Sequence, residues 1–195
     1  MLREQITATA KQAFAQKLFA GTSGNLSAYI KDKDLILITP TCVRYETMRP
    51  EDIVIIHTDG EKVEGHYEPS SEWRLHAAIY KAYPELGAIF HTHSPYATAF
   101  AVVHQPIETT LIETYFFLGG EVRCAEYATP GTWEVGTNAV LALQDRGGCL
   151  LNNHGVVAVG KDIAEAHLRA EYIEDAAKIG FFARQLGEPV ILSKL

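Results

Sequence analysis

The sequence predicts an α/β fold in which a β-sheet is covered by helices. Short β-branched runs alternate irregularly with segments of helical periodicity, and the first strands follow one another as in a hairpin. The 195 residues, 47% of them hydrophobic, supply enough apolar side chain for one sizeable core. No repeat, linker or low-complexity tract divides the chain. We therefore expect a single domain over residues 1–195.

The first third of the chain predicts one helix and three strands. Apolar residues at helical spacing favour a helix over residues 3–20, and Gly21 stands where a C-terminal cap belongs. Short apolar runs predict strands over residues 26–30, 35–38 and 53–57. A charged tetrapeptide separates the first two strands, so we expect them to pair as a hairpin.

A helix and a strand follow in the middle of the chain. Two serines, Ser70 and Ser71, precede an i, i+3, i+4, i+7 apolar pattern that stops at Pro84, which predicts a helix beginning near residue 71. Residues 88–93 read as a strand. No glycine-rich GxGxxG turn follows any predicted strand, so a dinucleotide-binding fold is not supported.

The last third predicts two helices that flank a pair of strands. Apolar spacing favours a helix over residues 132–144. Residues 150–159 form two apolar strand segments bent at Asn152-Asn153-His154-Gly155. Asp162, with Glu165 three residues later, begins a final helix that ends near residue 187.

The charge and the termini bear on partners and location. The net charge is −7 with a pI near 5.6, and the acidic residues are scattered, so we expect no nucleic-acid or membrane partner. The N-terminus has no uninterrupted apolar stretch, which favours a cytoplasmic protein. The final Ser193-Lys194-Leu195 matches a peroxisomal targeting tripeptide, which is weak evidence at that length.

The three cysteines argue against two kinds of site. Cys42, Cys124 and Cys149 are widely spaced and form no CxxC pair, so neither a disulfide framework nor a thiolate zinc site is expected. Free cysteine is often an interior residue, and we expect all three to be buried.

A histidine pair is the first candidate for metal binding. His91 and His93 lie at the end of a predicted strand, where residues two apart project from the same face. His154 lies in a turn between apolar segments, where it has no evident packing role. Catalytic zinc sites typically use three protein ligands and leave a fourth position open. These three imidazoles therefore make a candidate zinc site.

A carboxylate at a helix start completes the set. Glu72 begins the predicted helix one turn before His76, so both side chains lie on one face. We expect Glu72 to fill or vacate the fourth metal position and His76 to support a ligand. The remaining histidines have no comparable arrangement and should be solvated or locally hydrogen-bonded: His57, His66, His104 and His167.

Three hydroxyl-rich segments are candidates for anion binding. Gly21-Thr22-Ser23-Gly24-Asn25 has a composition suited to wrapping backbone N–H groups around an anion. Thr39-Pro40-Thr41 ends a strand, and Ser70-Ser71 precedes a helix N-terminus. Each has an ordinary explanation as a turn or a cap. Because Ser71 directly precedes Glu72, a phosphate held there would lie beside the metal.

These motifs together resemble the class II aldolase family, which includes fuculose-phosphate aldolase, ribulose-phosphate 4-epimerase and the adducin head. The resemblance covers residues 3–187 approximately. Five segments carry it, in the family's order: Gly21-Thr22-Ser23-Gly24-Asn25, Ile38-Thr39-Pro40-Thr41, Pro69-Ser70-Ser71-Glu72-Trp73-Arg74, His91-Thr92-His93 and Asn153-His154-Gly155.

The resemblance implies a fold, an assembly and a set of site residues. The fold is three-layer α/β/α with a mostly antiparallel central sheet, and relatives form homotetramers with active sites at subunit borders. Glu72 is the implied acid/base as well as a metal ligand. The other implied zinc ligands are His91, His93 and His154, and the implied phosphate pocket is Gly24, Asn25, Thr41, Ser70 and Ser71.

Two departures concern the second acid/base. Where fuculose-phosphate aldolase has a tyrosine ahead of a Gly-Gly pair, this chain has Glu113 ahead of Gly119-Gly120, with Tyr115 nearby. The longer tail that supplies another tyrosine in relatives is also missing after Leu195. Glu113 and Tyr115 are therefore both candidates for this role.

The expected activity is retro-aldol cleavage of a ketose 1-phosphate, of the fuculose or 5-deoxyribulose kind, to dihydroxyacetone phosphate and an aldehyde. Zn²⁺, one per subunit, is the expected cofactor, with Co²⁺, Mn²⁺ and Fe²⁺ as alternatives. A methylthioribulose-1-phosphate dehydratase and a ribulose-5-phosphate 4-epimerase are rival readings on the same scaffold. An adducin-like binding module and a zinc hydrolase are more distant ones.

Overall fold

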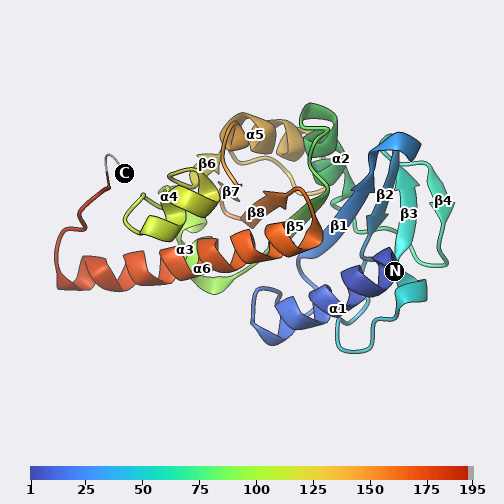
Figure 1. Cartoon of the computed structure of the whole chain (residues 1–195), viewed down its shortest axis with the longest axis horizontal. Coiled ribbons are helices and arrows are strands. Elements are labelled where there is room, and N and C mark those ends of the chain that lie inside the picture. The colour runs from blue at the N-terminus through green and yellow to red at the C-terminus, as the bar shows by residue number, and fades with distance from the viewer. Residues whose placement is uncertain (193–195) are drawn as a thin grey trace.

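The computed structural model describes residues 1–192, which form one eight-stranded sheet with helices on both faces (Figure 1). The helices are α1 (Leu2–Ala15), α2 (Trp73–Ala82), α3 (Pro95–Val102), α4 (Ile112–Leu118), α5 (Trp133–Leu143) and α6 (Ile163–Leu186), with 3₁₀ turns η1 (Lys31–Lys33) and η2 (Pro50–Asp52). The strands are β1 (Asn25–Ile30), β2 (Leu35–Ile38), β3 (Val54–His57), β4 (Lys62–Glu64), β5 (Ala88–Thr92), β6 (Arg123–Ala125), β7 (Gly148–Leu151) and β8 (Gly155–Gly160).

The sheet is almost entirely antiparallel. The strand order is β4-β3-β2-β1-β5-β8-β7-β6, and only the β6–β7 pair is parallel. β1 and β2 pair as the predicted hairpin. The expected α/β fold with a mostly antiparallel central sheet is confirmed.

Two apolar cores separate the sheet from its helical layers. On one face, α1, α3 and α6 bury residues such as Ile6, Phe90 and Ile173. On the other face, α2 and α5 pack Leu75 and Ala139 against the sheet. Because side chains alternate along a strand, the odd-numbered residues of β5 face α2, as do their antiparallel partners on β1. This face carries the polar side chains described below.

The first helix ends earlier than its apolar pattern predicted. It stops at Ala15, and Lys17 adopts the left-handed conformation, with φ of 65°. The backbone N–H of Leu18 donates to the Ala13 carbonyl, and that of Lys17 to Phe14, which is the hydrogen-bonding pattern of a Schellman cap. The prediction that Gly21 caps this helix is wrong, because Lys17 takes the position that usually favours glycine.

The other predicted elements are present, and four further ones had no sequence signal. Residues 71–84 and 132–144 contain α2 and α5, and the Asp162 carboxylate accepts the Glu165 N–H at the start of α6. α3 has apolar residues on every side and therefore shows no helical period, and α4 is only two turns long. β4 and β6 have three residues each, too few for an alternating pattern.

Three smaller expectations have different outcomes. Cys149 is buried and Cys124 half-buried, but Cys42 is exposed at a left-handed position in the turn after β2, so its predicted burial is wrong. The turn places it at the surface whatever its side chain prefers. The terminal Ser193-Lys194-Leu195 lies outside the described residues. Within residues 1–192, none of the helices combines the length and apolarity needed to cross a bilayer.

Candidate metal centre

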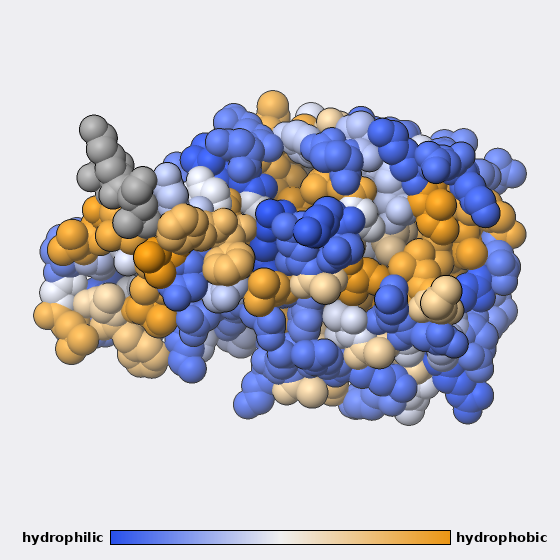
Figure 2. Space-filling model, in the orientation of Figure 1, coloured by the Kyte–Doolittle hydropathy of each residue, from blue (hydrophilic) through white to orange (hydrophobic). Residues whose placement is uncertain are grey.

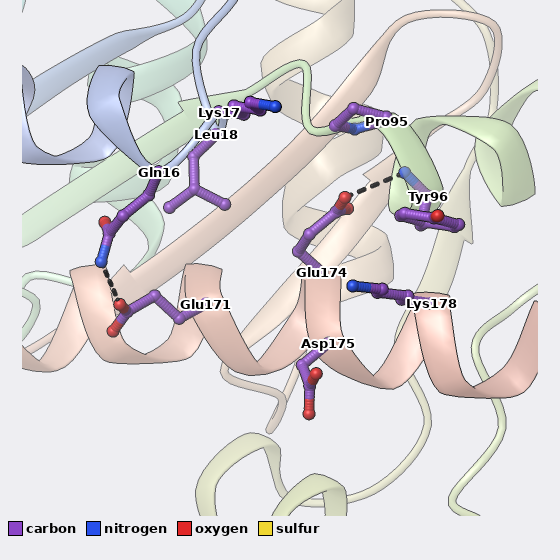
Figure 3. A pocket seen from close by; sticks show the side chains of 9 residues that line it. All are labelled: Gln16, Lys17, Leu18, Pro95, Tyr96, Glu171, Glu174, Asp175 and Lys178. Carbon is purple, nitrogen blue, oxygen red and sulfur yellow. Dashed lines mark hydrogen bonds between the residues drawn. The ribbon is translucent and has the colours of Figure 1, made fainter.

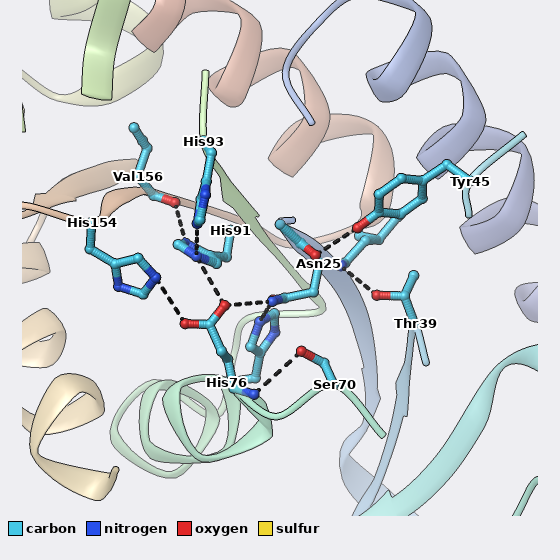
Figure 4. Close-up of polar contacts among 12 residues, drawn as sticks. Asn25, Thr39, Tyr45, Ser70, His76, His91, His93, His154 and Val156 are labelled. Carbon is cyan, nitrogen blue, oxygen red and sulfur yellow. Dashed lines mark hydrogen bonds and ion pairs between the residues drawn. The ribbon is translucent and has the colours of Figure 1, made fainter. Parts of the chain in front are cut away.

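Four side chains from three distant segments converge at one point, and Figure 4 labels the three histidines among them. Glu72, His91, His93 and His154 each offer a ligand atom, and all four atoms lie within 4.8 Å of one another. The predicted metal-ligand residues are therefore brought together. Glu72 immediately precedes α2, His91 lies on β5, His93 follows it, and His154 lies in the turn between β7 and β8.

The sheet order explains this convergence. β5 lies between β1 and β8, and His91 is the register partner of Asn25 on one side and of Val157 on the other. The short β7–β8 turn therefore places His154 beside the end of β5. Helix α2 covers the same face of the sheet and carries Glu72 at its start.

The donor atoms are in direct contact. The two Glu72 oxygens lie 3.1 Å (Oε2) from His91 Nε2 and 3.0 Å (Oε1) from His154 Nε2. The Nε2 atoms of His91 and His93 lie 3.0 Å apart. His91 Nδ1 is 2.9 Å from the Val156 carbonyl, to which it must donate, so in the neutral ring the lone pair is on Nε2 and faces the cluster.

The donor set fits a divalent cation. Glu72 Oε1 is buried and has no hydrogen bond of acceptable geometry, although it lies close to the His154 ring. A buried carboxylate oxygen without a hydrogen bond, facing imidazole nitrogens, suits metal coordination better than hydrogen bonding. Three imidazoles and one carboxylate are typical zinc ligands.

Gly155, at the start of β8, lets that strand lie close to the end of β5, where His91 and His93 are found. A Cβ atom at this position would lie 2.4 Å from the Thr92 carbonyl oxygen and 2.9 Å from His93 Cδ2. The absence of a side chain at residue 155 is therefore required for the observed positions of His91 and His93.

Protonation of these groups is set by burial and by each other. Burial raises the pKa of the Glu72 carboxyl, but the imidazoles of His91 and His154 outweigh it and hold that pKa well below its usual range. Burial lowers the pKa of His91, but the Glu72 carboxylate raises it above the ordinary value of 6.5. Burial and the charge of His91 lower the pKa of His93 to about 4.

A second row of polar side chains lies behind the cluster. Asn25 Nδ2 donates to Glu72 Oε2 over 3.0 Å, and Asn25 Oδ1 contacts His76 Nε2 (Figure 4). His76 Nδ1 lies 2.6 Å from the Ser27 hydroxyl, which lies 2.8 Å from the Tyr80 hydroxyl. His76 therefore supports Glu72 through Asn25. Burial lowers the pKa of His76 to about 3, so it is neutral at pH 7.

Ser27 and Tyr80 are functional candidates that the sequence analysis missed. The signal was present in their spacing. Ser27 is two residues after Asn25 on a strand, and Tyr80 is four residues after His76 on a helix, so each shares a face with a residue already singled out.

The three hydroxyl-rich segments lie side by side next to Glu72. The Thr41 N–H donates to the Glu68 carbonyl and the Ser70 N–H to the Thr39 carbonyl, which joins the second segment to the third. The Leu26 N–H donates to Thr39 Oγ1, which joins the first to the second. The predicted phosphate-binding residues are therefore grouped: Gly24, Asn25, Thr41, Ser70 and Ser71.

Two of these five residues already use their side chains to bind Glu72. The Asn25 side chain is occupied by Glu72 and His76. Ser70 Oγ accepts the backbone N–H of Glu72 at 3.3 Å. Thr41 is half-buried, Gly24 is half-buried and Ser71 is exposed at the surface of the group.

Comparison with known proteins agrees with this arrangement. The family model described as Class II Aldolase and Adducin N-terminal domain matches residues 4–181. The chain belongs to this family. Among class II aldolase relatives, a 5-deoxy-D-ribulose 1-phosphate aldolase of Bacillus thuringiensis serovar kurstaki is 38% identical, over 97% of this chain and 89% of its own length.

Two further proteins are similar to this chain over most of their length. An L-ribulose-5-phosphate 4-epimerase of Salmonella paratyphi C is 37% identical, over 84% of this chain and 76% of its own. The solved structure of an L-fuculose 1-phosphate aldolase superimposes with a TM-score of 0.95 at 36% identity, covering 99% of this chain and 91% of that one. The predicted family resemblance is confirmed.

Glu113 and Tyr115 are not part of the cluster within one chain. Both lie on α4, which packs against α6, and Tyr115 is 39% exposed. In the described part of the chain, no hydrogen bond or ion pair joins either residue to the four candidate ligands.

A cavity of about 480 Å³ lies between residues 16–18, the start of α3 and one side of α6 (Figure 3). Its polar groups hold the fold together. Glu174 accepts the backbone N–H groups of Tyr96 and Ala97 at the N-terminus of α3, and Gln16 donates to Glu171. None of the four candidate ligands lines this cavity.

The other histidines have local partners, as expected. His57 contacts the Asp34 carbonyl, His104 the Asn153 side chain and His167 the Gln16 side chain. His66 lies 3.3 Å from Asp52 at the surface.

Proposed function

We propose that this class II aldolase family member cleaves a ketose 1-phosphate, of the 5-deoxyribulose or fuculose kind, to dihydroxyacetone phosphate and an aldehyde. The observation that carries the proposal is the cluster of Glu72 and three imidazoles beside the hydroxyl-rich segments. The family match and the names of two similar aldolases support the same reaction class.

We propose zinc as the resident metal, held by Glu72, His91, His93 and His154. The imidazole-rich donor set supports this choice, and Co²⁺, Mn²⁺ or Fe²⁺ are alternatives for the same ligands. A bound divalent cation supplies Lewis-acid stabilisation of the negative charge that develops on the ketose oxygens as the carbon–carbon bond breaks.

The chain's own residues have two tasks in this reaction. Glu72 is the proposed acid/base, since its carboxylate is ionised and its Oε1 has no hydrogen bond of acceptable geometry that would occupy it. The group of Gly24, Thr41, Ser70 and Ser71 is the proposed phosphate site, in which hydroxyls and backbone N–H groups orient the substrate with its reacting end towards Glu72.

We propose that the active form is a homotetramer with sites at subunit borders. Its support is an apolar end of the molecule, formed by α4 and the C-terminal half of α6 (Figure 2). This apolar end exposes Phe116, Phe117, Ile179, Phe181, Phe182 and Leu186. Contiguous exposed aromatics of this kind are typical of protein interfaces. Glu113 and Tyr115 lie on α4, together with Phe116 and Phe117. We therefore assign their acid/base role to the active site of a neighbouring subunit.

A 4-epimerase is the second candidate, because a similar relative carries that name. Such an enzyme cleaves the same kind of bond and rejoins the fragments with inverted configuration. A dehydratase of methylthioribulose 1-phosphate is a third reaction compatible with Glu113 near the substrate.

One experiment separates these reactions. The purified protein is analysed for bound metal and incubated with fuculose, rhamnulose, 5-deoxyribulose and methylthioribulose 1-phosphates and with ribulose 5-phosphate, and the products are identified by NMR. The aldolase releases dihydroxyacetone phosphate and an aldehyde, the epimerase returns an inverted pentulose phosphate, and the dehydratase expels water. A protein that binds no divalent metal and converts none of these substrates would contradict the proposal.

A further inference from the structure

A chain of hydrogen bonds leads from Tyr80 to Glu72, and the chemistry of its last acceptor fixes the direction of every bond. An ionised carboxylate only accepts, so the atom of Asn25 that lies 3.0 Å from Glu72 Oε2 must be the amide nitrogen. The amide oxygen of Asn25 then faces His76 Nε2, and this ring nitrogen must carry the proton.

The remaining directions follow in turn. His76 is neutral, so a proton on Nε2 leaves a lone pair on Nδ1, which accepts the Ser27 hydroxyl over 2.6 Å. Because the Ser27 hydrogen is used there, its oxygen accepts from the Tyr80 hydroxyl over 2.8 Å. Every donor in the row therefore points towards Glu72.

Burial leaves these groups no alternative partner in water. Ser27, His76 and Tyr80 are fully buried, and Asn25 is 2% exposed. An unpaired polar group at this depth costs about 1 to 3 kcal/mol. Reversing the direction of one hydrogen bond would leave a buried donor or acceptor unpaired. The row therefore has one stable set of hydrogen-bond directions.

The row forms because side chains on one face recur at nearly the same distance along a helix and along a strand. Four residues along a helix rise about 6 Å and two residues along a strand about 6.6 Å. Glu72, His76 and Tyr80 of the α2 segment therefore stay in step with Asn25 and Ser27 of β1, and their side chains meet alternately. This match holds Glu72 in register with the sheet that carries His91.

We propose that the row Tyr80–Ser27–His76–Asn25 is a positioning device that fixes Oε2 of Glu72 and leaves Oε1 as the oxygen that exchanges between metal and proton. Oε1 has no hydrogen bond of acceptable geometry, and its nearest polar neighbour is the candidate ligand His154, whose Nε2 lies 3.0 Å away. The inference rests on the acid/base role of Glu72 proposed above, and it makes His76 a positioning residue.

The first test uses the metal-free protein and needs no activity. Long-range ¹H–¹⁵N NMR of histidine-labelled protein is expected to show His76 as the neutral Nε2–H tautomer at pH 7. The Nδ1–H tautomer, or a mixture of the two, would overturn the inference directly.

The second test compares two substitutions of His76. His76→Leu removes both hydrogen bonds at similar volume and is expected to lower zinc affinity and kcat by about 10- to 100-fold, with KM within about twofold. His76→Gln places an amide N–H near the position of Nε2 and is expected to recover part of the loss. Ser27→Ala, a smaller change, should have a weaker effect in the same direction and serves if His76→Leu does not fold.

A matched control is His167→Leu, which removes another buried, hydrogen-bonded imidazole on the opposite face of the sheet. It should leave zinc affinity and kcat unchanged. Wild-type affinity and kcat in folded His76→Leu, with Glu72→Gln inactive, would refute the positioning device alone. Full turnover by Glu72→Gln would instead refute the proposed function.

Discussion

His91 and His93 bring their Nε2 atoms within 3.0 Å of each other, with their ring planes at 75°. Because His91 uses Nδ1 to donate to the Val156 carbonyl, the Nε2 lone pair of its neutral ring points at His93. A buried and a half-buried imidazole arranged in this way are best stabilised by a shared cation, and the predictions below follow from that geometry.

Glu72→Gln tests the carboxylate. The amide keeps an acceptor for Asn25 but loses the charge that binds metal and proton, so we expect partial retention of zinc and a fall in kcat of at least about 100-fold. Metal content and the rate of aldehyde release measure the two effects. Glu134→Gln, at an exposed position of α5, is the control and should match wild type. Equal rates of aldehyde release by Glu72→Gln and wild type would contradict the assigned role.

Metal binding should depend on pH through His91. Its pKa is lowered by burial but raised overall by Glu72, so the metal-free protein holds a proton on His91 above pH 6.5. A metal ligand must be neutral, so the proton competes with the metal and zinc affinity should rise with pH until His91 is deprotonated. His93, with a pKa of about 4, and the ionised Glu72 do not titrate in this range.

Calorimetry in buffers of different ionisation enthalpy measures this linkage. Because the pKa of His91 is raised above 6.5, zinc binding at pH 6.5 should release a proton from its ring. Zinc binding at pH 6.5 without proton release would show that His91 is not the competing group.

Gly155→Ala tests the close approach of the two strands. The added Cβ meets the Thr92 carbonyl oxygen at 2.4 Å, so His91 and His93 must shift. We expect about 1 to 3 kcal/mol of destabilisation and at least a tenfold loss of zinc affinity. Gly180→Ala is the control. Gly180 lies within α6, and a Cβ atom there would meet only Phe100, at 3.6 Å. Because alanine favours a helix more than glycine does, this variant should be at least as stable as wild type.

Phe116→Glu tests the apolar end as a subunit interface. Phe116 is 67% exposed, and a charge there should break association, so light scattering should report a smaller species than wild type. Leu141→Glu is matched in exposure, at 66%, but lies on α5 outside the apolar end. It should leave the mass unchanged. A wild-type mass for Phe116→Glu would place the interface elsewhere.

Much of the fold was readable from local patterns. Helical spacing gave α2, α5 and α6, and the charged residues after β1 gave the first hairpin. The end of α1 was missed because Lys17, and not a glycine, takes the left-handed position. α3 was missed because helix periodicity disappears when every side is apolar.

The sequence by itself determined which residue types were available for the site: a carboxylate at a helix start, an HxH pair on a strand and a histidine in a turn. Only the tertiary structure decided which atoms meet. Asn25, predicted to bind phosphate, uses its side chain to hold Glu72, and Ser27 and Tyr80 join it through His76. The reason is physical, since periodicity reports the face on which a side chain lies, whereas the partner across that face depends on strand order and on where a helix crosses the sheet.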